Sequence, residues 1–161
     1  MPDNYPPELI QLAKWEAIKL EETLSYLKQI KSSYTKWEKG EITRAQLANE
    51  LIPIYKKVKK MKDEYKTLRS EINFAQSEAV NHKDYQSALY QGGIVRNHIL
   101  SFTSSVCLGY PAAKGTLANL PPEKDDFIKE LYESQIEFGC PKRIKILYEK
   151  LLELKKKGVL K

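Results

Sequence analysis

The sequence predicts an all-α protein, a helical bundle of about five helices with a long, coiled-coil-like helical hairpin at its N-terminus. Apolar residues recur at spacings of three and four along most of the 161 residues. No segment alternates with the period of two that is typical of a half-buried strand, and glycine is scarce, at seven residues. A chain of this length can bury a real core, so we expect a single domain over residues 1–161.

Residues 1–80 are expected to form the hairpin. Its first helix should begin at Pro6 and Pro7 and end at Gly40. The expected buried seam of this helix consists of Ile10, Ala13, Ala17, Leu20, Leu24, Leu27 and Tyr34.

The second helix of the hairpin should start at a capping box, formed by Thr43 and Gln46. An unbroken alternation of four and three residues follows, and this 3.5-residue period predicts left-handed packing of helix on helix. Pro53 falls inside the pattern, where we expect a kink rather than an end. The repeat consists of Leu47, Leu51, Ile54, Val58, Met61, Tyr65, Leu68, Ile72, Ala75 and Ala79.

A central apolar helix should organise the remaining compact part, residues 84–161. Residues 85–113 carry one charged side chain, Arg96, in a protein that is 30% charged. Such a segment must be buried over most of its circumference. We expect Asp84 to cap this helix and Gly109 to end it.

Two glycines, Gly92 and Gly93, fall in the middle of this central helix. Each costs on the order of 1 kcal/mol against alanine. They should either kink the helix or allow another element to pack closely against it.

Two further helices are expected after an irregular connector. The first should open at Glu123, after two prolines, and end at Gly139; it carries Phe127, Ile128, Leu131 and Phe138. Pro141 should open the last helix, which Gly158 should end.

The formal net charge of +6 is unevenly distributed. Residues 54–69 hold seven basic side chains against two acidic ones, and residues 142–161 hold eight against two. Segregated positive charge is typical of a protein that binds a polyanion, although lysine-rich helix faces also serve only to keep a protein in solution. The candidate nucleic-acid-binding residues are Lys56, Lys57, Lys59, Lys60, Lys62, Lys66, Arg69, Lys142, Arg143 and Lys145.

Any such contact should be to the phosphate backbone, because 23 of the 27 basic residues are lysine and arginine is the better residue for reading bases. Binding should then be sensitive to salt and weak in sequence preference, to either DNA or RNA. Tyr55 and Tyr65 border the basic stretch and could stack on bases, but as seam aromatics they are expected to pack in the core.

The central helix also carries a polar cluster, Arg96, Asn97, His98 and Ser101. The run from His98 through Leu100 and Ser104 to Leu108 and Gly109 partly resembles the phosphoacceptor helix of histidine phosphotransfer domains, which are four-helix bundles. The resemblance implies phosphoryl transfer through His98. Ser101 and Phe102 replace that family's lysine and glycine, and the favoured alternative is a neutral histidine hydrogen-bonded within the bundle.

The sequence gives little indication of a metal site, a reactive thiol or a catalytic centre. Arg96 should pair with an acid from another helix, or else bind an anionic group. Glu78 and His82 share a helix face, but nothing completes a metal site, so we expect no metal and no cofactor. Cys107 and Cys140 are expected to be ordinary thiols of a cytoplasmic protein. We expect no enzymatic activity and no membrane span.

The sequence therefore favours a non-enzymatic, basic helical protein that contacts nucleic acid within a larger assembly, such as a replication or ribonucleoprotein complex. The alternative is a protein–protein interaction scaffold that binds no nucleic acid. Other subunits, or a second copy of the chain, would then pack on the helical seams.

Overall fold

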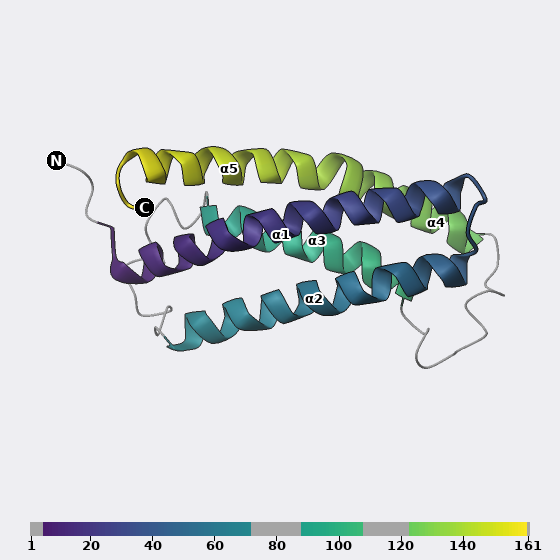
Figure 1. Ribbon diagram of the computed structural model, residues 1–161, viewed down its shortest axis with the longest axis horizontal. Helices are drawn as coiled ribbons and strands as arrows, with labels where there is room; N and C mark the ends of the chain where they lie inside the picture. Colours follow the sequence, from purple (N-terminus) through teal and green to yellow (C-terminus); the bar gives the residue numbers. More distant parts are fainter. Residues whose placement is uncertain (1–4, 72–87, 108–122, 161) are drawn as a thin grey trace.

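The computed structural model describes residues 5–71, 88–107 and 123–160. They form α1 (Pro7–Glu38), α2 (Arg44–Glu71), α3 (Tyr90–Cys107), α4 (Glu123–Leu131), the π-helix η5 (Tyr132–Gly139) and α5 (Cys140–Lys156) (Figure 1). No strand occurs in the described part of the chain. The predicted all-α bundle with a long N-terminal hairpin is confirmed.

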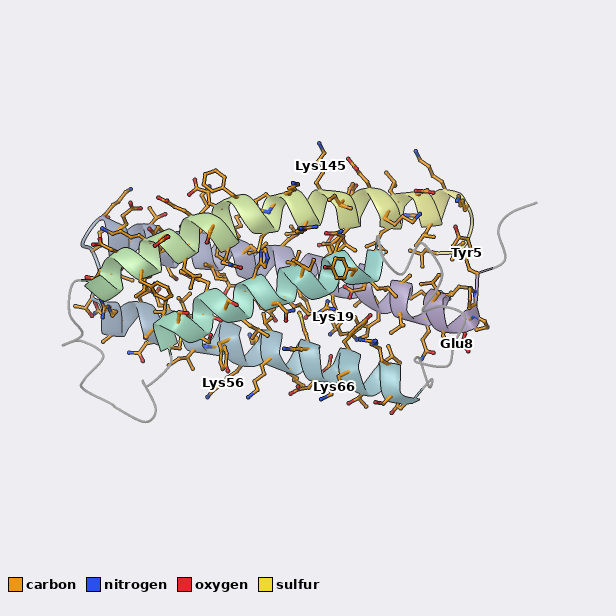
Figure 2. The ribbon with its side chains drawn as sticks, turned by 180° about the vertical axis from the view of Figure 1, so that it is seen from behind. Tyr5, Glu8, Lys19, Lys56, Lys66 and Lys145 are labelled. Atoms are coloured by element: carbon orange, nitrogen blue, oxygen red, sulfur yellow. The ribbon has the colours of Figure 1, made fainter. Side chains whose placement is uncertain are left out.

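The predicted central helix is indeed central. α3 contacts α1, α2, α4, η5 and α5. Figure 2 shows α3 in front, between α5 and α2, with α1 behind it. Its fully buried apolar side chains are Val95, Ile99, Phe102 and Val106. The expected cap Asp84 and the expected end Gly109 lie outside the described residues.

The ends of the hairpin follow the predicted local signals. Gly40 has a φ of 77°, the left-handed conformation that glycine adopts without strain, and it follows Lys39, the C-cap of α1. The Thr43 hydroxyl accepts a hydrogen bond from the Gln46 amide (3.1 Å), and the Gln46 side chain accepts one from the Thr43 amide (2.8 Å). Pro53 lies inside α2 without ending it.

The predicted seam of α2 is buried from Leu47 to Met61, and Tyr65 and Leu68 are half-buried. The predicted seam of α1 needs correction, because Leu24 is 43% exposed and Glu16 is buried. The reason is that α1 packs on more than one neighbour. Its side chains contribute to one apolar cluster with α2 and α3 and to a second with α5, so no single 3.5-residue stripe describes its buried surface.

The predicted helix boundary at Gly139 and Pro141 is also wrong. Gly139 and Cys140 have helical backbone angles, and α4, η5 and α5 run on without a break. The Cys140 amide donates to the Gln135 carbonyl, five residues earlier, which is the π-helical pattern. Pro141 has no amide hydrogen, so the wider π turn carries the helix past a residue that cannot bond four residues back.

Gly139 serves a different purpose from the expected one. A Cβ atom built there would lie 2.6 Å from the Nδ1 atom of His98 on α3. The missing side chain therefore lets α3 approach the π-helix closely.

Candidate functional site

The polar cluster on α3 does not form one site. Successive helical residues point about 100° apart, so neighbours in sequence face different elements. Arg96 is buried toward α1, and His98 lies against η5. Asn97 and Ser101 instead line a hollow between α3 and α2.

Arg96 pairs with an acid from another helix, as expected. Its guanidinium donates hydrogen bonds of 2.9 and 2.7 Å to the two carboxylate oxygens of Glu16 on α1. The guanidinium also lies 5.0 Å from the ring centroids of both Trp15 and Tyr65. Burial raises the pKa of Glu16, while the Arg96 charge lowers it. Two hydrogen bonds and two aromatic faces together compensate the desolvated cation.

Sequence reasoning did not find Glu16. A signal was available, because Glu16 falls between Ala13 and Leu20 at the three- and four-residue spacing of buried positions on α1. An acid at such a position must find a buried cation. Gly92 on α3 makes room for this carboxylate, since a Cβ atom at Gly92 would lie 2.4 Å from a Glu16 oxygen. The close packing expected for the two glycines is therefore found at Gly92 alone, and Gly93 faces open space.

His98 is half-buried, and its Nδ1 atom is shielded from solvent and makes no hydrogen bond within the described residues. Burial lowers the pKa of His98; the Gln135 backbone, as a hydrogen-bond partner of the imidazole, raises it by less, and the Arg143 cation lowers it by the smallest amount. A phosphoacceptor histidine presents its imidazole to a partner protein. The placement of His98 against Gly139 gives that reading no support.

Several basic side chains gather in a hollow between α2 and α3, which we call the groove. Its volume is about 880 Å³. From α2 it receives one acidic residue, Asp63, two tyrosines, Tyr55 and Tyr65, and four cations, which we call the basic row. The basic row consists of Lys59, Lys62, Lys66 and Arg69.

The basic row follows directly from the sequence pattern. Its members, with Tyr55 before them, recur at spacings of four and three, one residue after the buried positions Ile54, Val58 and Met61. The row therefore runs along one edge of the packed seam. From Lys59 to Arg69 it extends over eleven residues, about 15 Å along the helix axis. Asn97, Leu100, Ser101 and Ser104 form the α3 wall opposite.

A smaller hollow of about 140 Å³ continues the groove toward the N-terminal end of α3. It shares Tyr65, Arg69 and Asn97 with the groove, and it is also lined by Tyr90 and Gly93. The two hollows thus form one continuous depression along the junction of α2 and α3.

Three candidate residues on α2 lie outside the groove. Lys57 and Lys60 line hollows on the α1 side of α2, and the Lys57 ammonium lies 5.9 Å from the Tyr26 ring centroid. Lys56 is exposed and points away from the bundle (Figure 2). The hollow on the α1 side that Lys57 and Lys60 line holds three lysines against two glutamates, so its charge is more mixed than that of the groove, where four cations face one acid.

The candidates on α5 are not brought to the groove. Lys145 points outward from the edge of the bundle opposite to Lys56 and Lys66 (Figure 2). Lys142 is exposed as well. Arg143 is half-buried and donates a hydrogen bond of 3.0 Å to Gln91, so it ties α5 to α3. The two basic stretches of the sequence therefore do not share one surface.

Groups for other chemistry are not assembled in the part of the chain that the structure describes. No three His, Cys, Asp or Glu side chains there are grouped as metal ligands would be, and Glu78 and His82 lie outside that part. Both cysteines are free and buried, and burial raises the pKa of each thiol to about 12. None of the described helices is both long and apolar enough to cross a bilayer.

The described residues define an all-α helical bundle in which the groove is strongly basic. Comparison of the chain with protein-family models, with curated proteins and with solved structures found no match.

Proposed function

We propose that this protein binds the phosphate backbone of nucleic acid in the groove between α2 and α3, as a non-enzymatic subunit of a larger assembly. The observation that carries the proposal is the basic row, four cations against one acid along a continuous depression. A surface of one sign inside a concave wall concentrates the electrostatic field and attracts a polyanion.

The composition of the row supports a backbone contact. Its cations recur every three or four residues, about 5 Å apart along the helix axis, so that several can act on one strand of phosphates. Three of the four are lysines, which act as point charges rather than as forks that read base edges. Binding should therefore depend strongly on salt and little on sequence.

The test is a comparison of two triple variants of equal charge. The first is Lys59→Glu, Lys62→Glu and Lys66→Glu in the groove; the second is Lys142→Glu, Lys145→Glu and Lys155→Glu on α5. Each takes the formal net charge from +6 to 0. Binding to labelled oligonucleotides would be measured by fluorescence anisotropy at about 50 and 200 mM salt, the range over which several phosphate contacts lose affinity by orders of magnitude.

We expect the unmodified protein to lose affinity steeply between the two salt concentrations. The groove variant should lose binding at both salt concentrations. The α5 variant should still bind, and the slope of its log affinity against log salt concentration should be at least half that of the unmodified protein. If the two variants lose affinity equally, net charge alone governs binding and the groove has no special role. If the unmodified protein does not bind even at low salt, the proposal fails.

A second candidate function, a protein-interaction scaffold, is favoured by the outer face of the last helix. Phe138 and Tyr148 are 68% and 57% exposed, and Leu152 is also exposed. Pro141, Lys145, Tyr148 and Leu152 recur at spacings of four and three along α5, which places them on one stripe, and Phe138 precedes this stripe in η5. Lys145 lies in the middle of this stripe and would oppose itself in a symmetric pair of copies. An amphipathic helix with an acidic residue opposite Lys145 is the better-matched occupant.

This second function would be tested with a synthetic amphipathic helix that has a leucine seam and one central glutamate. Binding should be lost in Tyr148→Asp and weakened when the central glutamate of the peptide becomes lysine. Sedimentation of the protein alone would show whether it self-associates. If it does, a second copy of the chain rather than an acidic helix occupies the stripe on α5.

A further inference from the structure

The shape of the groove bears on which form of nucleic acid it takes. Proteins that read duplex DNA commonly insert a helix into the major groove, which is about 12 Å wide, and that helix must project from its domain. Here the basic row lies on α2, which α1 and α3 flank. The row lines a wall of a depression rather than the crest of a free helix. A convex duplex can touch the rim of such a depression, whereas a single strand can enter it.

The two walls of the groove also differ in chemistry. The α2 wall carries the cations, and the α3 wall presents the neutral polar side chains of Asn97, Ser101 and Ser104. Asn97 and Ser101 are exposed, so they can donate to and accept from a ligand. An unpaired strand has phosphates on one side and open base edges on the other. A duplex offers no unpaired base edges to the second wall.

The size of the groove and its aromatic lining also favour a single strand over a duplex. Its volume of about 880 Å³ is within the range of roughly 300–1,000 Å³ that holds small-molecule ligands, which leaves room for one or two nucleotides. Tyr55 lies one helical turn before Lys59, at the end of the basic row, and is half-buried. A ring beside a row of cations is the arrangement on which single-stranded bases stack. Tyr65 is less available, because its ring contacts Trp15 and Arg96.

We propose that the groove selects single-stranded nucleic acid, with phosphates on the basic row, a base stacked on Tyr55, and neighbouring base or sugar groups hydrogen-bonded to Asn97 and Ser101. This inference rests on the proposed function of the groove. It adds the form of the ligand and the residues that distinguish it.

The experiment uses the full chain, a labelled single strand of about 12 nucleotides, a length within the site sizes of known single-strand binders, and a hairpin duplex with the same number of phosphates. Both are measured at the same salt concentration. We expect at least tenfold tighter binding to the single strand. Tyr55→Ala should weaken single-strand binding about tenfold, which is within the measured range for one stacked base. Tyr55→Phe, which keeps the ring, should bind as the unmodified protein does. Asn97→Ala removes a hydrogen-bonding side chain from the α3 wall, and because Asn97 is exposed the substitution leaves the core unchanged.

The outcomes separate the two proposals. Equal binding of single strand and duplex, both lost in the triple groove variant, would overturn the selectivity and leave the polyanion-binding function intact. Unchanged single-strand binding by both Tyr55→Ala and Asn97→Ala would also overturn it. Absence of binding to either ligand would instead remove the function on which the inference rests. Circular dichroism of each variant would serve as the control that its helices are retained.

Discussion

Arg96 on α3 and Glu16 on α1, eighty residues apart in sequence, form a two-fold hydrogen-bonded ion pair in the core. The side chains of Arg96 and Glu16 are only 4% and 2% exposed. The pair fixes α1 against α3, and the Tyr65 ring that lines the groove packs on the Arg96 guanidinium. The core contact therefore supports one wall of the proposed binding site.

Arg96→Met should destabilise the protein by about 3–5 kcal/mol, because it leaves the Glu16 carboxylate buried without its cation. The double variant Arg96→Met with Glu16→Leu should recover most of this loss, since it removes both charges. Urea unfolding of the two single variants and the double variant gives the coupling free energy. A loss below about 1 kcal/mol for Arg96→Met would mean that Glu16 is not held as a buried ion.

Gly92 and Gly93 form a matched pair for substitution by alanine. A Cβ atom at Gly93 meets nothing within 4 Å, so Gly93→Ala should stabilise the helix by about 1 kcal/mol. A Cβ atom at Gly92 would displace the Glu16 carboxylate from Arg96, so Gly92→Ala should destabilise the protein by about 1–3 kcal/mol despite the same helical gain. Thermal unfolding measures both, and equal effects at the two positions would contradict the close contact.

The stability of the protein should decrease as the pH falls below about 6.5. Burial lowers the pKa of His98 in the folded state from its ordinary value of 6.5, so the unfolded chain takes up a proton more readily. The stabilisation is complete above pH 6.5 and is lost as the pH falls from there through the lower folded-state pKa. The urea midpoint would be measured between pH 8 and pH 5 for the unmodified protein and for His98→Gln. The variant should show the smaller decrease, and parallel curves would exclude His98 as the source.

The thiols of Cys107 and Cys140 should be unreactive in the folded protein. Both are buried, and a pKa of about 12 leaves almost no thiolate near neutral pH. Labelling with a disulfide reagent at pH 8 should be at least about a hundredfold slower in buffer than in denaturing urea. Rapid labelling of one cysteine in buffer would reveal local opening at its helix, and single Cys→Ser variants assign it.

Local sequence signals predicted much of the fold. The capping residues Thr43 and Gln46 and the terminal glycines Gly40 and Gly158 act through neighbours a few residues away, so a single sequence shows them directly. Gly158 has a φ of 80° after α5, as its predicted role requires. The central position of α3 could also be predicted from the sequence, because a segment with almost no charged side chains must be buried.

The sequence-based predictions were wrong or incomplete at residues whose environment is set by contacts between distant parts of the chain. Leu24 fits the apolar spacing of α1 but is exposed, because α1 divides its buried surface between different neighbours. Gly139 suggests a helix end, yet its lack of a side chain accommodates His98 from α3. The partner of Arg96 could not be assigned, because many acids were available and only the fold selects Glu16.

The candidate site was predicted in part. The lysine-rich segment of α2 was identified, but sequence reasoning did not divide it into the residues of the groove and those facing α1. That division depends on which side of α2 meets α3. Arg143 was placed among the binding residues although it hydrogen-bonds Gln91, a contact that no local pattern indicates.

The π-helical turn in η5 has a consequence for how the length of this chain can vary. The turn holds one more residue than an α-helical turn and accommodates that residue within a single turn. Deleting the extra residue would restore regular α-helical geometry and leave the face of α5 nearly unchanged, whereas deleting one residue from α5 ahead of Leu147 would rotate the rest of α5 by about 100°. Leu147, Leu151 and Leu154 would then leave the core. Homologues of this protein should therefore differ in length by one residue more readily within η5 than within α5.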